Sequence, residues 1–155
     1  AGLPVTTEAT THHFTLTHAE CASYDPLYKV NPPLRTAEDV EAVKAGLADG
    51  TIAVIATDHA PHAAETKELP FDQAPPGMLG LETALALALT ELELPIQQVL
   101  AALSWNPAQV IGIGDAHGLP VAEGNPANLC IIDPEATWTV DGTKMASRSH
   151  NTPAP

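Results

Sequence analysis

The chain has 155 residues, of which 19 are Asp or Glu and 6 are Lys or Arg, so its formal net charge at pH 7 is −13 with neutral histidines. A negative field of this size repels phosphate backbones and anionic membrane surfaces, which argues against nucleic acid or a membrane surface as a partner. Hydrophobic residues make up 45% of the chain, enough for a packed core and too much for an acidic disordered tail.

No apolar run is long enough to span a membrane, and the first residues lack the basic and apolar regions of a secretory signal. Cys21 and Cys130 are too far apart for a zinc knuckle and too few for a disulfide scaffold, so we expect a reducing, cytoplasmic environment. The chain does not begin with Met, and its first segment already has the pattern of a strand. We therefore expect a fragment that begins in mid-domain.

The first third of the chain predicts a strand, a loop and a helix. Residues 3–10 are rich in β-branched residues and predict a strand that ends at the pair His12 and His13. A long loop follows, stiffened by two consecutive prolines. Thr36 and Asp39 then form the pattern of a capping box, which predicts a helix over 36–49.

The segment 51–56 is continuously apolar, which is typical of a strand buried on both faces of a parallel sheet. A helix followed by a buried strand predicts an α/β fold. The polar sequence TDHAPH follows at 57–62, at the carboxyl end of the strand, where α/β folds place their chemistry. We therefore look for function in this turn.

The remainder predicts helices and then short strands. Leucines recur on one face over 81–92, a second helix is expected over 95–103, and Asn106 followed by Pro107 predicts the capped start of a third. After Gly118 the composition changes, and two β-like runs appear at 128–133 and 136–140. These runs predict a sheet outside the main fold.

Asp58 is the strongest candidate for chemistry, because a carboxylate at a strand end can ligate a metal or act as a general base. The alternative is that Asp58 caps the following segment and that His59 and His62 are surface residues. His12 and His13 are a natural donor pair for a metal, but adjacent side chains of a strand point to opposite faces, which argues against a shared ion.

Two loops offer further candidates. The amide of Asn31, held by the prolines after it, could bind a substrate, or it could form an Asx turn. The sequence Pro75-Pro76-Gly77 could let the backbone approach a ligand closely, and the simpler interpretation is a turn.

These motifs together resemble the carboxyl-terminal part of class I dihydroorotases. The similar segments are KVNPPLR (29–35), TDHAPH (57–62), GMLGLET (77–83), NPA (106–108), 118–129 and SHNTP (149–153). Hydantoinases and allantoinases share the Asp-His pair but usually lack the Ala-Pro-His that follows it here. The resemblance spans almost the whole chain.

The resemblance implies a fold and a reaction. Members of the family are metal-dependent amidohydrolases on a distorted (β/α)8 barrel with a small β-sandwich, and they interconvert dihydroorotate and N-carbamoyl-aspartate in pyrimidine synthesis. Residues 1–117 would be the carboxyl-terminal part of this barrel. Residues 118–155 would be part of the β-sandwich and a tail.

The resemblance also implies roles for individual residues. Asp58 would ligate zinc and carry the proton of the metal-bound hydroxide. Asn31 and His62 would bind the substrate, with His62 near its carboxylate, and the backbone of Pro76 and Gly77 would meet the dihydropyrimidine ring.

The other zinc ligands of the family, which hold one or two ions, would lie upstream of Ala1. Because catalytic zinc usually has three protein ligands, we expect the isolated chain to be inactive. Two alternatives stay open: a non-catalytic dihydroorotase-like partner of aspartate transcarbamoylase, and a related hydantoinase or allantoinase. The resemblance also leaves open a homodimer or an aspartate transcarbamoylase complex for the active enzyme.

Overall fold

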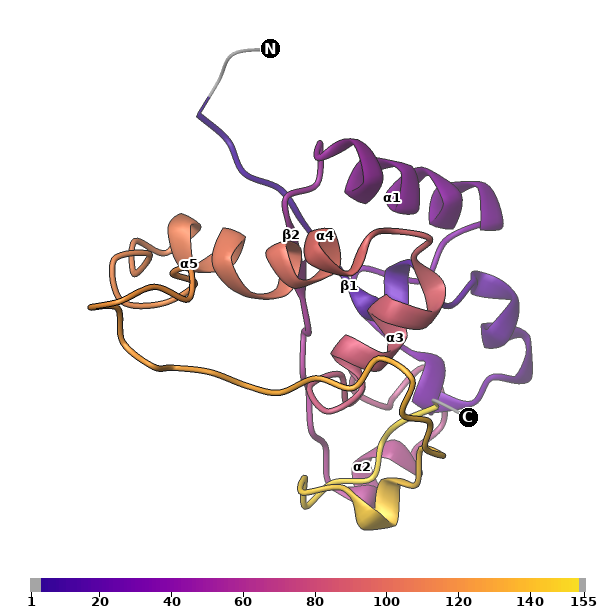
Figure 1. Cartoon of the computed structure of the whole chain (residues 1–155). Coiled ribbons are helices and arrows are strands. Elements are labelled where there is room, and N and C mark those ends of the chain that lie inside the picture. Colours follow the sequence, from indigo (N-terminus) through magenta and orange to yellow (C-terminus); the bar gives the residue numbers. More distant parts are fainter. Residues whose placement is uncertain (1–3, 154–155) are drawn as a thin grey trace.

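The computed structural model describes residues 4–153 and contains a small parallel sheet surrounded by helices (Figure 1). The strands are β1 (Glu8–Thr10) and β2 (Val54–Ala56). The helices are α1 (Ala37–Asp49), α2 (Ala64–Lys67), α3 (Ala84–Glu91), α4 (Ile96–Leu100) and α5 (Asn106–Val110). Short 3-10 turns occur at Thr11–His13, His18–Ser23, Pro26–Tyr28 and Gly142–Lys144.

The two strands pair in parallel, with Glu8 opposite Val54 and Thr10 opposite Ala56. This confirms the parallel arrangement that the apolar run at 51–56 predicts, and Val54 and Ile55 are buried. The paired part of the first strand is shorter than the predicted range 3–10, whose first residue lies outside the described part of the chain. Residues 4–7 are exposed, although the amide of Ala53 still donates to the carbonyl of Thr7 at 3.2 Å.

Helix α1 begins and ends where the sequence predicts. The Thr36 hydroxyl accepts from the amide of Asp39, and the Asp39 carboxylate accepts from the amide of Thr36, which completes a capping box. Gly50 ends the helix in the left-handed conformation, with φ of 79°. Val40 and Leu47 face the interior.

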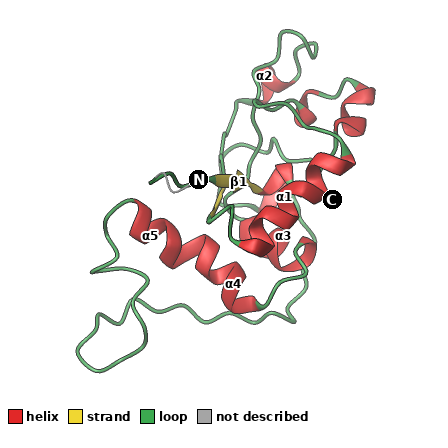
Figure 2. Ribbon diagram, turned by 90° about the horizontal axis from the view of Figure 1, so that it is seen from above, coloured by secondary structure: helices red, strands yellow, loops and turns green. Residues whose placement is uncertain are grey.

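The core lies between the sheet and helices α1, α3 and α4 (Figure 2). Its buried members are Phe14, Leu47, Ile55, Ala88, Leu92, Val99 and Ala102. The predicted leucine face over 81–92 is only partly right: α3 begins at Ala84, Leu81 is 61% exposed, and the buried residues of the helix are Ala84 and Ala88, while Leu85 and Leu89 are partly buried against the core.

The predicted third helix is not separate. Helix α4, a π-helical stretch at Ala101–Trp105 and α5 follow one another without a break, and Asn106 is helical with no capping hydrogen bond. Pro107 lacks an amide hydrogen and its ring crowds the preceding turn, and the wider π-helical turn before it accommodates both effects. The Asn106 side chain instead donates to the carbonyl of Ala53 at 2.8 Å, which fixes this helix to the segment before β2.

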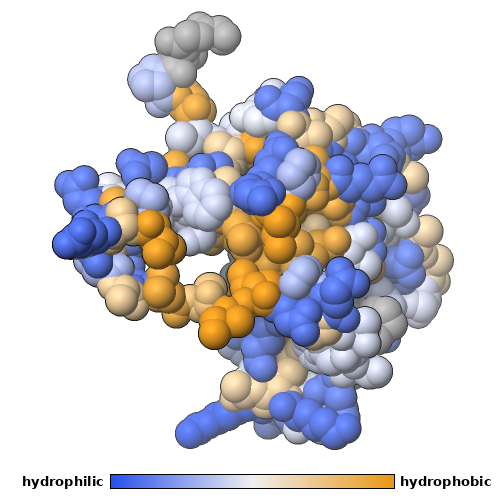
Figure 3. Space-filling view, viewed as in Figure 1, coloured by the Kyte–Doolittle hydropathy of each residue, from blue (hydrophilic) through white to orange (hydrophobic). Residues whose placement is uncertain are grey.

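The β-like runs at 128–133 and 136–140 do not form strands. Residues 118–141 run as an extended arm that leaves the end of α5 and returns across the body beside α3 (Figure 1), and no strand partner for them lies within residues 4–153. Large apolar side chains on the arm are exposed, including Val121, Leu129 and Ile131. Apolar side chains lie both along this arm and on the neighbouring body (Figure 3). A strand needs a neighbour for its backbone groups, so β propensity alone does not produce one here.

The described residues thus form a partial α/β unit. They form neither a closed barrel nor a β-sandwich, so those parts of the expected architecture are not observed. No helix within residues 4–153 has both the length and the apolar character needed to cross a membrane.

Candidate active site

The polar turn after β2 runs beside the loop that contains Pro76 and Gly77. The amide of Ala60 donates to the carbonyl of Met78 at 3.0 Å, and His59 and Met78 form a parallel bridge. Asp58 has φ of 45°, a left-handed conformation that is uncommon for residues other than glycine and is concentrated at functional sites. The turn therefore holds an unusual backbone at the position that the sequence singles out.

Asp58 is exposed, and its carboxylate makes no hydrogen bond within the described part of the chain. No group of three or more His, Cys, Asp or Glu residues that could hold a metal is found among residues 4–153. One carboxylate falls short of the three protein ligands that catalytic zinc usually has. The residues present therefore do not form a zinc site by themselves.

His59 is a structural residue of the turn. Its Nδ1 atom accepts hydrogen bonds from the amides of Gly80 and Leu81, both at 3.2 Å. An imidazole nitrogen that accepts two amide hydrogens carries no proton, so the neutral form of His59 has its proton on Nε2. This contact orients the loop that leads to α3, and the interpretation of His59 as a surface residue is wrong.

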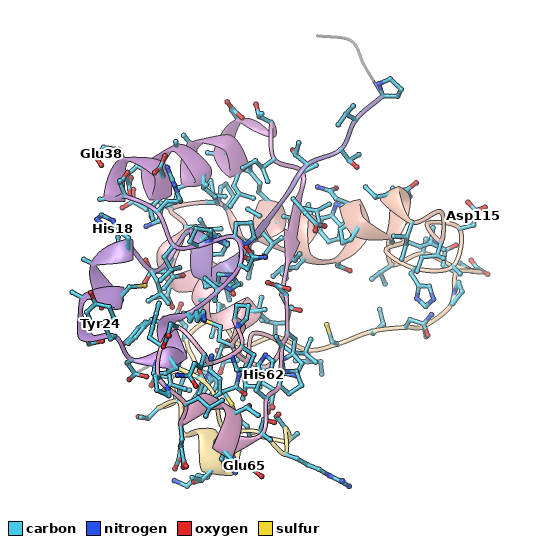
Figure 4. All side chains as sticks on the ribbon, turned by 180° about the vertical axis from the view of Figure 1, so that it is seen from behind. His18, Tyr24, Glu38, His62, Glu65 and Asp115 are labelled. Atoms are coloured by element: carbon cyan, nitrogen blue, oxygen red, sulfur yellow. The ribbon has the colours of Figure 1, made fainter. Side chains whose placement is uncertain are left out.

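His62 contacts the loop that the sequence links to it. Its Nε2 atom lies 3.0 Å from the carbonyl oxygen of Pro76, and because a carbonyl can only accept, Nε2 is the donor. The amide of His62 donates to the side-chain oxygen of Asn151 at 3.1 Å. In Figure 4, His62 lies among the crowded side chains of the lower part of the molecule, whereas Glu65, on α2, lies at its edge.

Gly77 is required by this packing. A Cβ atom at this position would lie 2.6 Å from the Cβ of Ala60 and 2.9 Å from Nε2 of His62, and φ is 129°. Both the space and the backbone conformation exclude other residues. The structure thus brings together three of the predicted site residues: His62, Pro76 and Gly77.

Asn31 is joined to this group through the backbone. The amide of Gly77 donates to the carbonyl of Lys29 at 2.8 Å, two residues before Asn31. The Asn31 side chain is exposed, and Val30 and Leu34 on either side of it are buried. The loop is therefore anchored while its polar amide stays accessible to a ligand.

His12 and His13 do not lie on a strand, so the geometric reason for excluding them as a pair is wrong. They lie on the 3-10 turn Thr11–His13, and the hydroxyl of Thr10 contacts Nε2 of His12 at 3.0 Å and Nδ1 of His13 at 2.6 Å. Nε2 of His13 donates to the carbonyl of Pro32 at 3.0 Å. Burial, followed by the charge of His13, lowers the pKa of His12 to about 4. His13 thus holds the proline loop, and Thr10 links it to the buried His12.

Sequence reasoning missed three residues that hold the site together. Asn151 is 4% exposed, and its amide group donates to the carbonyls of Ala60 and Gly77. The ammonium groups of Lys29 and Lys67 bind the carbonyls of the loop at 71–77. Lys29 and Asn151 lie in segments already singled out, whereas a lone lysine on a short helix gives no signal.

The amidohydrolase family model matches residues 11–150, so the chain belongs to the amidohydrolase family. Curated relatives narrow the similarity. The chain is 50% identical over 157 residues to a dihydroorotase of Pelotomaculum thermopropionicum and 47% identical over 156 residues to one of Mycobacterium leprae. Each alignment covers 98% of this chain and 36% of the relative, so the chain spans about a third of these proteins.

Solved structures agree on the family. The L-hydantoinase (dihydropyrimidinase) of Arthrobacter aurescens has a TM-score of 0.81 at 29% identity, covering 92% of this chain and 33% of that one. The D-hydantoinase (dihydropyrimidinase) of a Thermus species has a TM-score of 0.80 at 25% identity, covering 97% of this chain and 34% of that one. The resemblance to dihydroorotases seen in the sequence motifs is confirmed by the curated relatives.

Proposed function

We propose that this chain is the carboxyl-terminal part of a dihydroorotase, which hydrolyses dihydroorotate reversibly to N-carbamoyl-aspartate in pyrimidine synthesis. The observation that carries the proposal is identity of 47% to 50% with proteins named dihydroorotase over 98% of the chain. Residues 1–117 are assigned to the barrel of the longer protein and 118–155 to its β-sandwich and tail. We expect the chain by itself to be inactive and the longer enzyme to act in the cytoplasm.

In this proposal Asp58 supplies one ligand to zinc, and the remaining ligands come from residues outside this chain. Zinc would lower the pKa of a bound water. The Asp58 carboxylate is exposed at a strand end, where it is free to accept a proton and to return it to the leaving nitrogen. Its fixed left-handed backbone supports a defined orientation of this side chain.

The substrate contacts fall to the loops joined at Gly77. Asn31 would donate from its exposed amide, and His62 would bind the substrate carboxylate. Because His62 donates to the Pro76 carbonyl, substrate binding would exchange one acceptor for another at Nε2. The Pro76 carbonyl beside Gly77 would then be free to accept a hydrogen bond from an N–H group of the cyclic amide.

The test is turnover by the full-length polypeptide that carries this chain, with dihydroorotate, hydantoin and allantoin as substrates. We expect dihydroorotate to have the highest kcat/KM and Asp58→Asn to lower kcat by roughly 10²- to 10⁴-fold, the usual contribution of a positioned acid or base. Glu65→Gln, on the exposed face of α2, is the matched control. Full activity of Asp58→Asn would refute its role.

A related cyclic amidase is the second candidate, because the two solved relatives described above are hydantoinases. A higher kcat/KM for hydantoin or allantoin would favour it. No turnover of any of the three would favour a non-catalytic partner of aspartate transcarbamoylase. The molar mass of the full-length protein, measured by light scattering with and without that enzyme, tests a homodimer against a complex.

A further inference from the structure

We propose that Lys29 and Lys67 act as positioning residues, a lysine clamp whose two ammonium groups fix the 71–77 loop against the segment carrying Asn31. This inference rests on the proposed function, because it concerns how the substrate loops of that site are held. The lysine clamp itself is defined by contacts within this chain.

The loop carbonyls converge on the two ammonium groups. Nζ of Lys29 donates to the carbonyls of Phe71 at 2.7 Å, Asp72 at 3.2 Å and Ala74 at 2.7 Å. Nζ of Lys67 donates to the carbonyls of Pro75 at 3.1 Å and Gly77 at 3.0 Å. An ammonium group has three hydrogens, so Lys29 uses its full donor capacity on this loop. These lysines thus bind carbonyls that no helix or sheet satisfies.

This arrangement is energetically unusual. Lys67 is only 7% exposed, and lysine is rarely buried unless its charge is compensated. Neither ammonium group forms a salt bridge among the described residues, whose ion pairs involve Arg35, Lys44 and Lys144. The loop carbonyls, together with the nearby charge of Asp25, therefore compensate these charges. Burial and the nearby charge of Lys29 lower the pKa of Lys67, as expected for a buried ammonium group that forms no salt bridge.

Lys29 connects the two substrate loops directly. Its side chain binds the loop at 71–74, its carbonyl accepts from the amide of Gly77, and it precedes Asn31 by two residues. Lys67 completes the arrangement from α2, beside the turn that carries His62. Shifting either lysine would move Asn31 relative to Gly77, and displacements of about 1 Å at a substrate site can cost roughly 100-fold in kcat/KM, through substrate binding as well as through chemistry.

The proposal predicts a defect in binding more than in chemistry. In the full-length enzyme we expect Lys67→Met to raise KM for dihydroorotate by roughly 10- to 100-fold, while kcat changes much less. Lys29→Met should have the same effect. Lys44→Met is the control, because Lys44 is a half-buried lysine that pairs with Glu41 and Glu91 on the other side of the core. An unchanged KM in both clamp variants would overturn the proposal.

Hydrogen exchange gives a readout that does not depend on activity. Amides of Gln73, Ala74 and Gly77 are hydrogen bonded in this loop, and Lys67→Met should speed their exchange at least tenfold while leaving α1 unchanged. If exchange is faster in Lys67→Met but the full-length enzyme does not turn over dihydroorotate, the proposed function is refuted and the lysine clamp is supported. Unchanged exchange would refute the clamp, whatever the substrate. If Lys67→Met fails to fold, Lys67→Gln, which retains one donor group, carries the same test.

Discussion

Thr10 orders the protons of two histidines. The Pro32 carbonyl can only accept, so His13 carries its proton on Nε2 and its Nδ1 accepts from the Thr10 hydroxyl. The oxygen of that hydroxyl then accepts from Nε2 of His12. Nδ1 of His12 is left buried without a protein partner among the described residues. A single hydroxyl thus fixes both tautomers and ties β1 to the proline loop.

The lowered pKa of His12 makes stability depend on pH. The pKa of this side chain is 6.5 when the chain is unfolded and about 4 in the fold, so between these values the unfolded chain binds a proton that the folded chain does not. Stability should therefore be complete above about pH 6.5, fall as pH drops to 4, and level off below. The loss should reach at most about 3 kcal/mol.

Urea unfolding of the wild type and of His12→Gln at several pH values measures this contribution. The difference between the two proteins in free energy of unfolding should narrow as pH falls from 7 to 4. Val40→Ala, which changes a buried residue without a titratable group, is the control and should lower stability by a similar amount at every pH. A difference that does not vary with pH would mean that His12 is not protected from protonation.

Among the secondary-structure elements, features set by residues close in sequence were predicted correctly, and features set by residues distant in sequence were not. The capping box of α1 was predictable because Thr36 and Asp39 are three residues apart and recognise each other without the rest of the fold. Asn106, which is followed by Pro107, also has the sequence pattern of a helix N-cap. Its partner, the carbonyl of Ala53, is 53 residues away, and nothing near Asn106 in the sequence points to it.

Substitution of Asn106 distinguishes the two roles. A cap needs an acceptor, which aspartate supplies, whereas the contact with Ala53 needs a donor, which aspartate lacks. We expect Asn106→Asp to cost about 1 to 2 kcal/mol, as much as Asn106→Ala. Urea unfolding of both variants is the measurement. Thr36→Ser, which keeps the hydroxyl that caps α1 and donates to Asp39, should be nearly neutral. A neutral Asn106→Asp would restore the capping interpretation.

For the whole molecule, the sequence predicted the parallel α/β arrangement and singled out three residues that lie together, and it failed where partners are distant or outside the chain. His62, Pro76 and Gly77 were assigned from motifs, and the structure places them in contact. The clamp lysines were missed because their carbonyl partners carry no sequence signal. The runs at 128–133 and 136–140 have strand propensity without a neighbouring strand.

The extended arm at 118–141 carries a prediction for the longer protein. If the arm belongs to a β-sandwich, its apolar residues should become buried and its amides protected when the rest of the polypeptide is present. Hydrogen exchange at 128–140 should then be at least tenfold slower in the full-length protein than in this chain. Amides of α1 serve as the internal reference. Equally fast exchange in both proteins would contradict the assignment of the arm to a sheet.

Asn151 also sets the order of events during synthesis. It binds the amide of His62, 89 residues earlier, and its carbonyl accepts from the amide of Leu79. At 5 to 20 residues per second, a ribosome needs roughly 4 to 18 s to travel from His62 to Asn151. Throughout that interval the nascent chain has the polar turn after β2 but lacks the residue that secures it. A premature stop codon just before the codon for Asn151 would therefore leave the turn and the Gly77 loop without this contact, even though both segments had been translated.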